Sequence, residues 1–447
     1  MTGPTTAGGS ATEGFAEFAL SRLTLPESTR VAARMTLANG AAVMVGGSRD
    51  EAVTYALAAL TGSDDPKTCA VWGRAERTSM TAAALIGGIA AHVQDFDDTD
   101  LRSVVHAAAP VVPAAIALAE RSAASLTDVI DAVAAGVEIT LRVALGLGST
   151  HFARGWHITG TTGRIGAAAA AGRLLGLTVD QMRNALAIAA TEAAGLQAAF
   201  GTMTKSFHAG KAAYDGVEAA LLASFGFTAA PDAIEGSRGL TEVMSEDADQ
   251  SVMMDGLGVT WEIEHNAIKP YACGIVSHPV IDAAIELRRA GVTADEVDSV
   301  RLRTSPVVLQ VMGIEDPVDG LQSKFSVYHC FAVGLLDGAG GPAQFDDNHA
   351  VDPGVAALRR RITVELDPSV ARDECYAEVS GRSTRQVHIE HATGSVARPF
   401  TAEQLASKFL LLAEPILGAD RSEQLVDALL YGADRPIADV VSLASGG

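Results

Sequence analysis

Residues 155–175 decide the fold class, and they read GWHITGTTGRIGAAAAAGRLL. The second half of this stretch is almost entirely alanine, leucine and glycine. A helix that is apolar on every side has no face for water, so we expect it to lie among other helices. Glycines and threonines at a helix start leave backbone N–H groups that converge on one point and attract an anion. The stretch therefore predicts a helical protein with an anion site beside His157.

Helical periodicity continues on both sides of this stretch, from Phe15 to Phe227. Phe15, Phe18, Ala19 and Leu23 recur at the spacing of one helix face. Pro26 suits the first turn of the following helix. We expect helices at residues 26–45, 51–60, 80–92, 110–121, 126–145, 162–175, 179–200 and 208–225.

The pattern of apolar and polar residues changes after Trp261. Alternation typical of strands is found at residues 300–304, 362–366, 376–379 and 386–390. Helical patterns at residues 280–289 and 324–336 interleave with these strands, and two more follow at residues 401–417 and 422–430. The sequence predicts a smaller α+β unit over residues 266–398. Residues 1–14 lack the basic and apolar segments of a signal peptide, and we expect a disordered tail there.

Composition and charge exclude several function classes. The net charge is −21 and the pI is near 4.9, which argues against binding nucleic acid or anionic membranes. A bilayer-spanning helix needs roughly 18 apolar residues in a row, and we expect none. The four cysteines are too widely spaced for a disulfide framework, a zinc site or an iron–sulfur site. We expect a cytoplasmic enzyme.

Lysine is scarce in this chain. Of the 33 basic residues only six are lysine, which leaves 27 arginines (33 − 6). A chain that uses arginine for generic surface charge is expected to keep lysine where a compact charge or a shiftable pKa is needed. Lys205, Lys211 and Lys269 lie in segments that also carry histidine. Lys205 and Lys269 are the stronger functional candidates. The alternative interpretation is that they are surface lysines whose aliphatic chains pack on apolar residues.

The string His92-Val-Gln-Asp95-Phe-Asp97-Asp98-Thr99 concentrates carboxylates beside a histidine. At helical spacing Asp95, Asp98 and Thr99 share one face. Close carboxylates raise one another's pKa unless a cation lies between them, so they can orient a histidine or a lysine, or hold a proton. The cluster from Asp95 to Asp98 also fits a magnesium site, and a solvated helix end has the same pattern.

Three further segments carry histidine or lysine. His106 lies in an uncharged stretch, where a lone histidine is more often part of the core. Lys205 and His208 are three residues apart at a predicted helix start. A Schiff base of Lys205 with pyridoxal phosphate is disfavoured, because no phosphate loop follows a strand. Lys269-Pro-Tyr271 lies at the predicted domain boundary, where small-ligand sites concentrate.

Together these segments resemble the MmgE/PrpD family. The matching strings are Asp95-Phe-Asp-Asp-Thr99, Gly155-Trp-His-Ile-Thr-Gly-Thr-Thr-Gly163, Thr204-Lys-Ser-Phe-His-Ala-Gly210 and Lys269-Pro-Tyr271, with weaker matches at Lys324-Phe-Ser326 and from Ala402 to Phe409. They follow the family order over nearly the whole chain. The resemblance implies a mostly α fold, in which a large all-helical domain (residues 15–265 and 399–447) carries a smaller α+β lid domain (residues 266–398) inserted before the C-terminal helices. It also implies a homodimer and no metal or other cofactor.

The resemblance also implies the site residues. The implied catalytic residues are Asp95, His106, His157, Lys205 and Lys269, and the implied substrate-binding residues are Thr99, Thr159, His208 and Tyr271. The alignment of His106 needs one inserted residue after Thr99.

Three positions depart from the family pattern. Gly274 and His329 stand where decarboxylase-like members carry a histidine and a tyrosine. Asp100 stands where many relatives have histidine or tryptophan. The substrate is therefore expected to differ from those of the best-known members.

The implied reaction is proton transfer at a carbon next to a carboxylate of a small di- or tricarboxylic acid. Lys205 and Lys269 would stabilise the enolate, and His106 or His157 would be the general acid or base. Asp95 would orient its partner histidine, and the helix start after His157 would hold a second carboxylate. We expect a metal-independent lyase similar to 2-methylcitrate dehydratase or cis-aconitate decarboxylase.

Three alternatives remain open at this point. Within the family, the alternative is an epimerase of an amino or imino dicarboxylate, similar to iminodisuccinate epimerase. The residues alone also allow a metal-dependent enzyme that uses the cluster from Asp95 to Asp98, or a catalytically silent helical binding protein.

Overall fold

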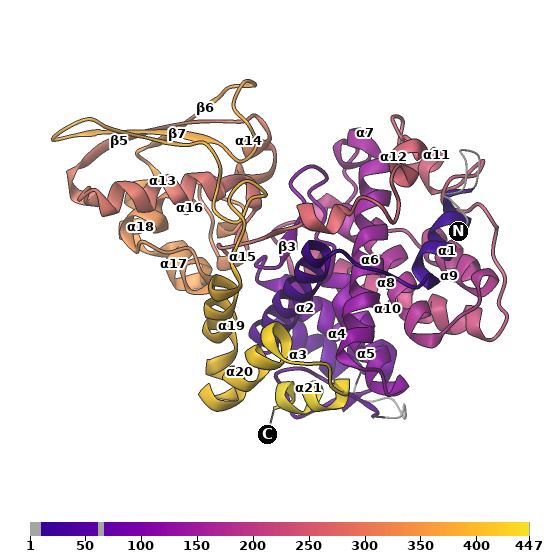
Figure 1. Ribbon diagram of the computed structural model, residues 1–447. Helices are drawn as coiled ribbons and strands as arrows, with labels where there is room; N and C mark the ends of the chain where they lie inside the picture. Colours follow the sequence, from indigo (N-terminus) through magenta and orange to yellow (C-terminus); the bar gives the residue numbers. More distant parts are fainter. Residues whose placement is uncertain (1–9, 61–66, 447) are drawn as a thin grey trace.

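The computed structural model describes residues 10–60 and 67–446, and its larger domain is built around one central helix, α8 (Figure 1). α8 (Ile158–Leu175) is buried from Ile158 to Gly172, and it packs against α5, α6, α9 and α10. Its small side chains let these neighbours approach closely. The first part of the helical domain contains α1 (Ala11–Leu20), α2 (Glu27–Gly47), α3 (Glu51–Leu60), α4 (Met80–Val93), α5 (Ala108–Ser122), α6 (Leu126–Gly146), α7 (Gly148–Ala153), α8, α9 (Val179–Thr191), α10 (Met203–Ser224), α11 (Leu240–Met244) and α12 (Gln250–Met254).

The C-terminal helices return to this domain. α19 (Ala402–Leu417) packs against α2, and α21 (Ile437–Ala444) packs against α5. α20 (Ala419–Val426) joins them and continues into one π-helical turn at Asp427–Tyr431. Among the helices of the described ranges, none combines the length and the apolar character needed to cross a bilayer.

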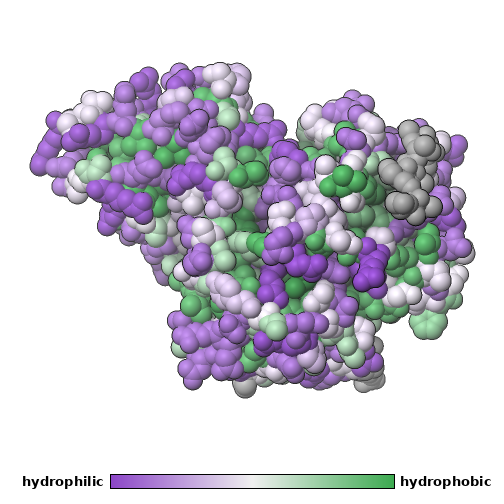
Figure 2. Space-filling model, viewed as in Figure 1, coloured by the Kyte–Doolittle hydropathy of each residue, from purple (hydrophilic) through white to green (hydrophobic). Residues whose placement is uncertain are grey.

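A lid domain lies between α12 and α19 in the sequence, and it projects from the helical domain as a separate lobe (Figures 1 and 2). Its sheet has the strand order β6-β5-β7-β8, in which only the β5–β6 pair is parallel. α13 packs against β7, β8 and α16. The strands are β5 (Val297–Thr304), β6 (Ile362–Leu366), β7 (Cys375–Gly381) and β8 (Arg385–Ile389), and the helices are α13 (His278–Arg289), α14 (Val307–Met312), α15 (Gly320–Ser323), α16 (Val327–Leu336), α17 (Asp347–Val351) and α18 (Pro353–Arg359). The predicted fold class, a helical domain with an inserted α+β lid, is confirmed.

Two short ribbons complete the helical domain. β1 (Cys69–Ala70) pairs with β2 (Arg77–Thr78). β3 (Asp98–Thr99) pairs antiparallel with β4 (Ala267–Ile268), and this pair joins the segment after α4 to the segment that leads to Lys269.

The local structure differs from the sequence prediction at several helix and strand ends, and three of these differences bear on the fold or the site. α1 begins at Ala11, inside the predicted tail, because the Ser10 side chain accepts a hydrogen bond from the Glu13 N–H and caps the helix. Residues 1–9 of that tail lie outside the described residues. α9 ends at Thr191 rather than at Phe200, and Gly195, inside the predicted helix, takes a φ of 132° that no helix allows. α10 begins at Met203, five residues before the predicted start.

Candidate active site

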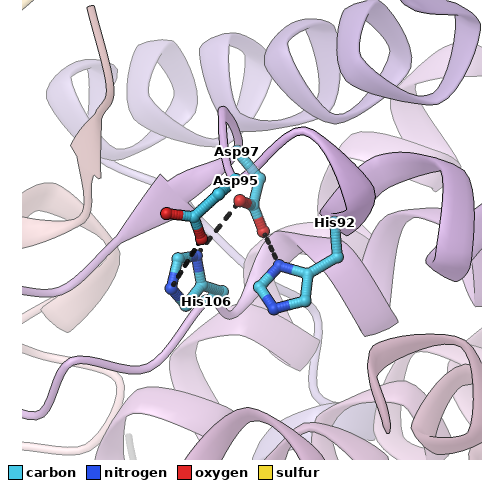
Figure 3. A group of neighbouring side chains, drawn as sticks. All are labelled: His92, Asp95, Asp97 and His106. Atoms are coloured by element: carbon cyan, nitrogen blue, oxygen red, sulfur yellow. Dashed lines mark hydrogen bonds and ion pairs between the residues drawn. The ribbon is translucent and has the colours of Figure 1, made fainter. Parts of the chain in front are cut away.

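The chain turns sharply after α4 and presents a group of acidic and imidazole side chains (Figure 3). α4 ends at Val93, and Asp95 adopts a φ of 52°, a left-handed conformation that is costly for a residue with a Cβ. The predicted helical face of Asp95, Asp98 and Thr99 is therefore wrong, because residues 98 and 99 form β3.

Asp97 bridges two histidines from different segments (Figure 3). Its Oδ2 lies 2.7 Å from His92 Nδ1, and its Oδ1 lies 3.1 Å from His106 Nδ1. All three side chains are buried. The sequence assigned the orientation of a histidine to Asp95, but Asp95 Oδ1 is 4.0 Å from His106 Nε2. Asp97 holds the rings instead.

The protonation states follow from this burial. Burial would raise the pKa of Asp97, but the imidazoles of His106 and His92 lower it well below its usual range. Burial lowers the pKa of His106 to about 3, against the opposing effect of Asp97. Burial and then Lys205 lower the pKa of His92. At neutral pH the carboxylate is charged and the two rings are in the base form.

Asp95 binds two lysines that are far apart in the sequence. Lys205 Nζ lies 2.5 Å from Asp95 Oδ1, and Lys269 Nζ lies 3.1 Å from Asp95 Oδ2. Lys269 Nζ also donates to the Asp95 carbonyl at 3.1 Å. Burial would raise the pKa of Asp95, but the ammonium groups of Lys205 and Lys269 lower it well below its usual range. This pair of contacts holds two positive charges side by side in the interior.

His157 stands at the start of α8. Its N–H donates to the Gly195 carbonyl at 3.0 Å, and its Nδ1 lies 3.0 Å from Nδ1 of His208. Its ring stacks on that of His92, with the ring centres 5.6 Å apart. Burial and then His92 and Lys205 lower the pKa of His157 well below its usual range. A second neutral imidazole is thus available beside His106.

Two threonines hold His106 in place. Thr99 Oγ1 lies 3.2 Å from His106 Nδ1 and donates to the Asp98 carbonyl at 2.7 Å. Thr159 Oγ1 accepts a hydrogen bond of 3.1 Å from the backbone N–H of His106. The ring and the backbone of His106 are therefore both fixed by residues of the helical domain.

These groups line one small cavity between the helical domain and the lid. Its volume is about 40 Å³, which is room for only a few water molecules. The residues that line it are Asp95, Thr99, Val104, His106, Phe152, His157, Phe200, Lys205, Lys269, Gly274, Ile275, Val276, Val311 and Phe325. One side of the cavity can bind an anion and exchange protons with it.

Sequence models of known families match both domains of this chain. The MmgE/PrpD N-terminal domain matches residues 15–253, and the MmgE/PrpD C-terminal domain matches residues 271–430. The chain belongs to the MmgE/PrpD family. The resemblance drawn from its motifs is thereby confirmed.

Several characterised proteins are similar to this MmgE/PrpD chain. Cis-aconitate decarboxylase of Aspergillus terreus is 30% identical over 410 residues, which cover 83% of this chain and 82% of that protein. Cis-aconitate decarboxylase of Homo sapiens is 28% identical over 80% of this chain and 77% of its own length. 2-Methylcitrate dehydratase of Cupriavidus necator is 27% identical over 47% of this chain and 45% of its own length. The prediction of a lyase of MmgE/PrpD type is confirmed.

Of the nine residues predicted for this MmgE/PrpD site, six line the cavity and three do not. Asp95, Thr99, His106, His157, Lys205 and Lys269 line the cavity. Thr159 and His208 lie behind it, where they contact His106 and His157. Tyr271 is turned away, and its hydroxyl donates to Asp282 Oδ1 of α13 at 2.5 Å. We therefore expect no contact of Tyr271 with the substrate.

Four residues near the site were not predicted. His92 and Asp97 belong to the string that drew attention to Asp95, but that string alone does not show which carboxylate faces the rings. Lys324 and Lys408 are two of the six lysines and lie in the weaker motif matches, but the sequence did not single them out as site residues. Lys324 lines a small pocket beside the cavity, together with Asp95 and Lys205. Burial lowers its pKa to about 8, although Asp95 opposes this.

Lys408 of α19 supports the site from behind. Its Nζ donates to Asn39 Oδ1 at 2.8 Å, to the Phe96 carbonyl at 2.6 Å and to the Lys269 carbonyl at 2.8 Å. These three bonds tie the last helices to the segments of Asp95 and Lys269. The C-terminal helices thereby help to place Asp95 and Lys269.

The acidic cluster fits a metal poorly. Donor atoms of His92, Asp95, Asp97 and His106 lie within 4.8 Å of one another. However, each oxygen of Asp95 faces an ammonium group, whose charge would repel a divalent cation. Asp98, which the magnesium hypothesis included, instead accepts from the Ala108 N–H at 3.0 Å and from the Asn266 amide.

Proposed function

We propose that the protein is a metal-independent lyase that moves a proton at a carbon next to a carboxylate of a small di- or tricarboxylic acid. The observation that carries this proposal is that Lys205, Lys269, His106 and His157 line one cavity. Two ammonium groups in a buried site suit a reaction in which negative charge develops on the substrate. The neutral imidazoles suit the removal and return of a proton.

In the proposed cycle, His106 removes the proton from the carbon next to the carboxylate. The electron pair moves into the carboxylate to form a dianionic enolate, which Lys205 and Lys269 stabilise. In a dehydration the pair then returns and expels a β-hydroxyl group, which takes a proton from an imidazolium and leaves as water. In a decarboxylation no proton is removed first. The bond between the carbon and a departing carboxylate breaks, its electron pair forms the enolate as carbon dioxide leaves, and the carbon then takes a proton from an imidazole that solvent has protonated.

Substrate entry requires the lid to move. The cavity holds only a few water molecules, and a dicarboxylic acid is larger than that. Residues 274–276, Val311 and Phe325 form the lid side of the cavity, so separation of these segments from the helical domain would admit the substrate. Closure would then exclude water from the charged groups.

Proton exchange tests the proposal directly. We expect incubation with a panel of small di- and tricarboxylic acids in deuterated water to show, by NMR, deuterium uptake with loss of water or carbon dioxide. Lys205→Met should abolish the exchange, and Lys211→Met, which changes a half-exposed lysine bound to Asp215, should leave it unchanged. A panel in which no acid exchanges or reacts would contradict the proposal and favour a silent binding protein.

An epimerase is the second candidate, because two imidazoles line the same cavity. One of His106 and His157 could remove the proton and the other could return it to the opposite face of the carbon. Deuterium uptake with inversion of a stereocentre, and without loss of water or carbon dioxide, would identify this reaction.

Two further predictions accompany the lyase proposal. Activity should persist after dialysis against EDTA, and an activity that is lost in EDTA and returns with magnesium would favour the metal-dependent alternative. The predicted homodimer should appear as twice the chain mass of 46.0 kDa in light scattering.

A further inference from the structure

The two sides of the cavity differ in chemistry. The polar lining residues are Asp95, Thr99, His106, His157, Lys205 and Lys269. Within the described ranges, every cavity-lining residue beyond Lys269 in the sequence is apolar. We call these residues the lid wall, and they are Gly274, Ile275, Val276, Val311 and Phe325.

The lid-wall side chains present an apolar surface to the cavity. A Cβ on Gly274 would overlap the Met312 sulfur, so the Met312 side chain fills the space beside this position. Phe325 stacks on Phe200 with ring centres 5.7 Å apart and planes at 18°, which extends the apolar surface into the helical domain. Val276 and Phe325 are buried, and this side of the cavity is expected to exclude a charged group.

The charge around the cavity is small. Among the described residues that line it, two ammonium groups face one carboxylate, that of Asp95, which leaves one positive charge. Lys324, beside the cavity, adds one more, and Asp97 behind His106 removes one. A third carboxylate that points at the lid wall would lie against apolar groups, because none of the lid-wall residues carries a cation. A buried charge without a partner is strongly unfavourable.

We propose that the substrate is an acid with no more than two carboxylates and an apolar substituent that contacts the lid wall. The carboxylate end lies against Lys205 and Lys269, and the substituent lies against Ile275, Val276 and Val311. This inference rests on the proposed function, since it narrows the acids on which that chemistry acts. It excludes tricarboxylic acids as preferred substrates.

Two substituted succinates of nearly equal shape test the inference. Isobutylsuccinate and carboxymethylsuccinate share the succinate core and differ in an isopropyl group against a third carboxylate. We expect isothermal titration calorimetry at pH 7 to show that isobutylsuccinate binds at least about tenfold more tightly. Equal or tighter binding of carboxymethylsuccinate would overturn the inference.

A change in the lid wall provides an independent test. Val311→Arg, on the half-buried face of α14, should reduce or reverse the preference, and Val311→Leu should keep it. A Val311→Arg protein that is folded, as judged by circular dichroism, and keeps the full preference would overturn the inference. If Val311→Arg does not fold, Ile275→Arg is measured in the same way, and the comparison of the two ligands on the unmodified protein remains decisive.

The experiments separate this inference from the proposed function. If tricarboxylic acids exchange their protons in deuterated water and bind more tightly, the proposed function stands and the inference fails. If no acid exchanges and neither succinate binds, both fail.

Discussion

Gly88 of α4 and Gly210 of α10 lie in direct backbone contact, so close that a Cβ on Gly88 would lie 2.6 Å from the Gly210 Cα. Gly88 precedes His92 by one helical turn, and Gly210 follows Lys205 by little more than one. The close crossing of the two helices therefore sets the distance between Asp95 and Lys205. Any side chain at this crossing must push the two helices apart.

Gly210→Ala should lower both stability and activity. Its Cβ would collide with the Leu85 carbonyl and with Ile89, and overpacking of this kind costs about 1–3 kcal/mol. Urea unfolding should show the loss of stability, and kcat should fall as Lys205 moves away from Asp95. Gly341→Ala is the control, because its nearest atoms are 3.7 Å away. A Gly210→Ala protein with unchanged stability and kcat would show that the crossing is not rigid.

Removal of either cavity lysine should abolish most of the activity. Lys205→Met and Lys269→Met should each lower kcat/KM by about 10²- to 10³-fold, because the enolate loses a preorganised positive charge. Each variant also leaves Asp95 with one partner fewer, so urea unfolding is measured in parallel. In each variant Asp95 keeps its ion pair with the other lysine, so we expect the protein to stay folded. A folded variant with normal kcat/KM would contradict the assigned role.

Loss of the charge on Asp97 should disturb both histidines at once. Asp97→Asn should lower kcat by roughly 10- to 100-fold, and His106→Gln by about 10²- to 10⁴-fold. His388→Gln, at an exposed position of the lid, is the matched control and should leave kcat unchanged. The role of Asp97 as the bridge between the rings would be excluded by an Asp97→Asn enzyme with normal kcat.

The dependence of kcat/KM on pH should reflect the loss of the proton from Lys324. Burial lowers its pKa to about 8, so a positive charge beside the cavity is present below pH 8 and is lost as the pH rises through that value. We expect kcat/KM for an anionic substrate to fall above about pH 8 for this reason. In Lys324→Arg the charge persists to a much higher pH, and the alkaline fall should move upward. A profile that is the same in both proteins would assign the fall to another group.

Asp98 should make stability depend on pH in the opposite sense to most carboxylates. Burial and then Asp97 raise its pKa to about 7, above the value of about 4 in an unfolded chain. Between these values the folded protein holds a proton that the unfolded chain has lost. The contribution of Asp98 to the free energy of unfolding therefore falls as the pH rises from about 4 to about 7, and it is constant above about pH 7. Relative to the unmodified protein, Asp98→Asn should become more stable over this range in urea unfolding.

Local patterns in the sequence were enough to predict the fold class. The apolar residues around Ala167 to Ala171 indicate a buried helix without reference to any other segment, since the signal lies within a few turns. The alternation at Val300 to Thr304 is equally local. The scarcity of lysine, together with histidines in the same segments, was enough to mark Lys205 and Lys269 as candidates.

The tertiary structure alone decided which groups meet. Asp95 and Lys205 are 110 positions apart, and Asp95 and Lys269 are 174 apart, so no periodicity connects them. Their contact depends on the crossing of α4 with α10 and on the β3–β4 pair. The turn after α4 also directs Asp95 toward the two lysines and Asp97 toward the two histidines. The non-helical segment after α9 likewise makes a distant contact, because the Gly195 carbonyl accepts a hydrogen bond from the His157 N–H. Sequence patterns describe neighbours along one helix or strand, whereas the charges of a buried site are paired by the packing of distant segments.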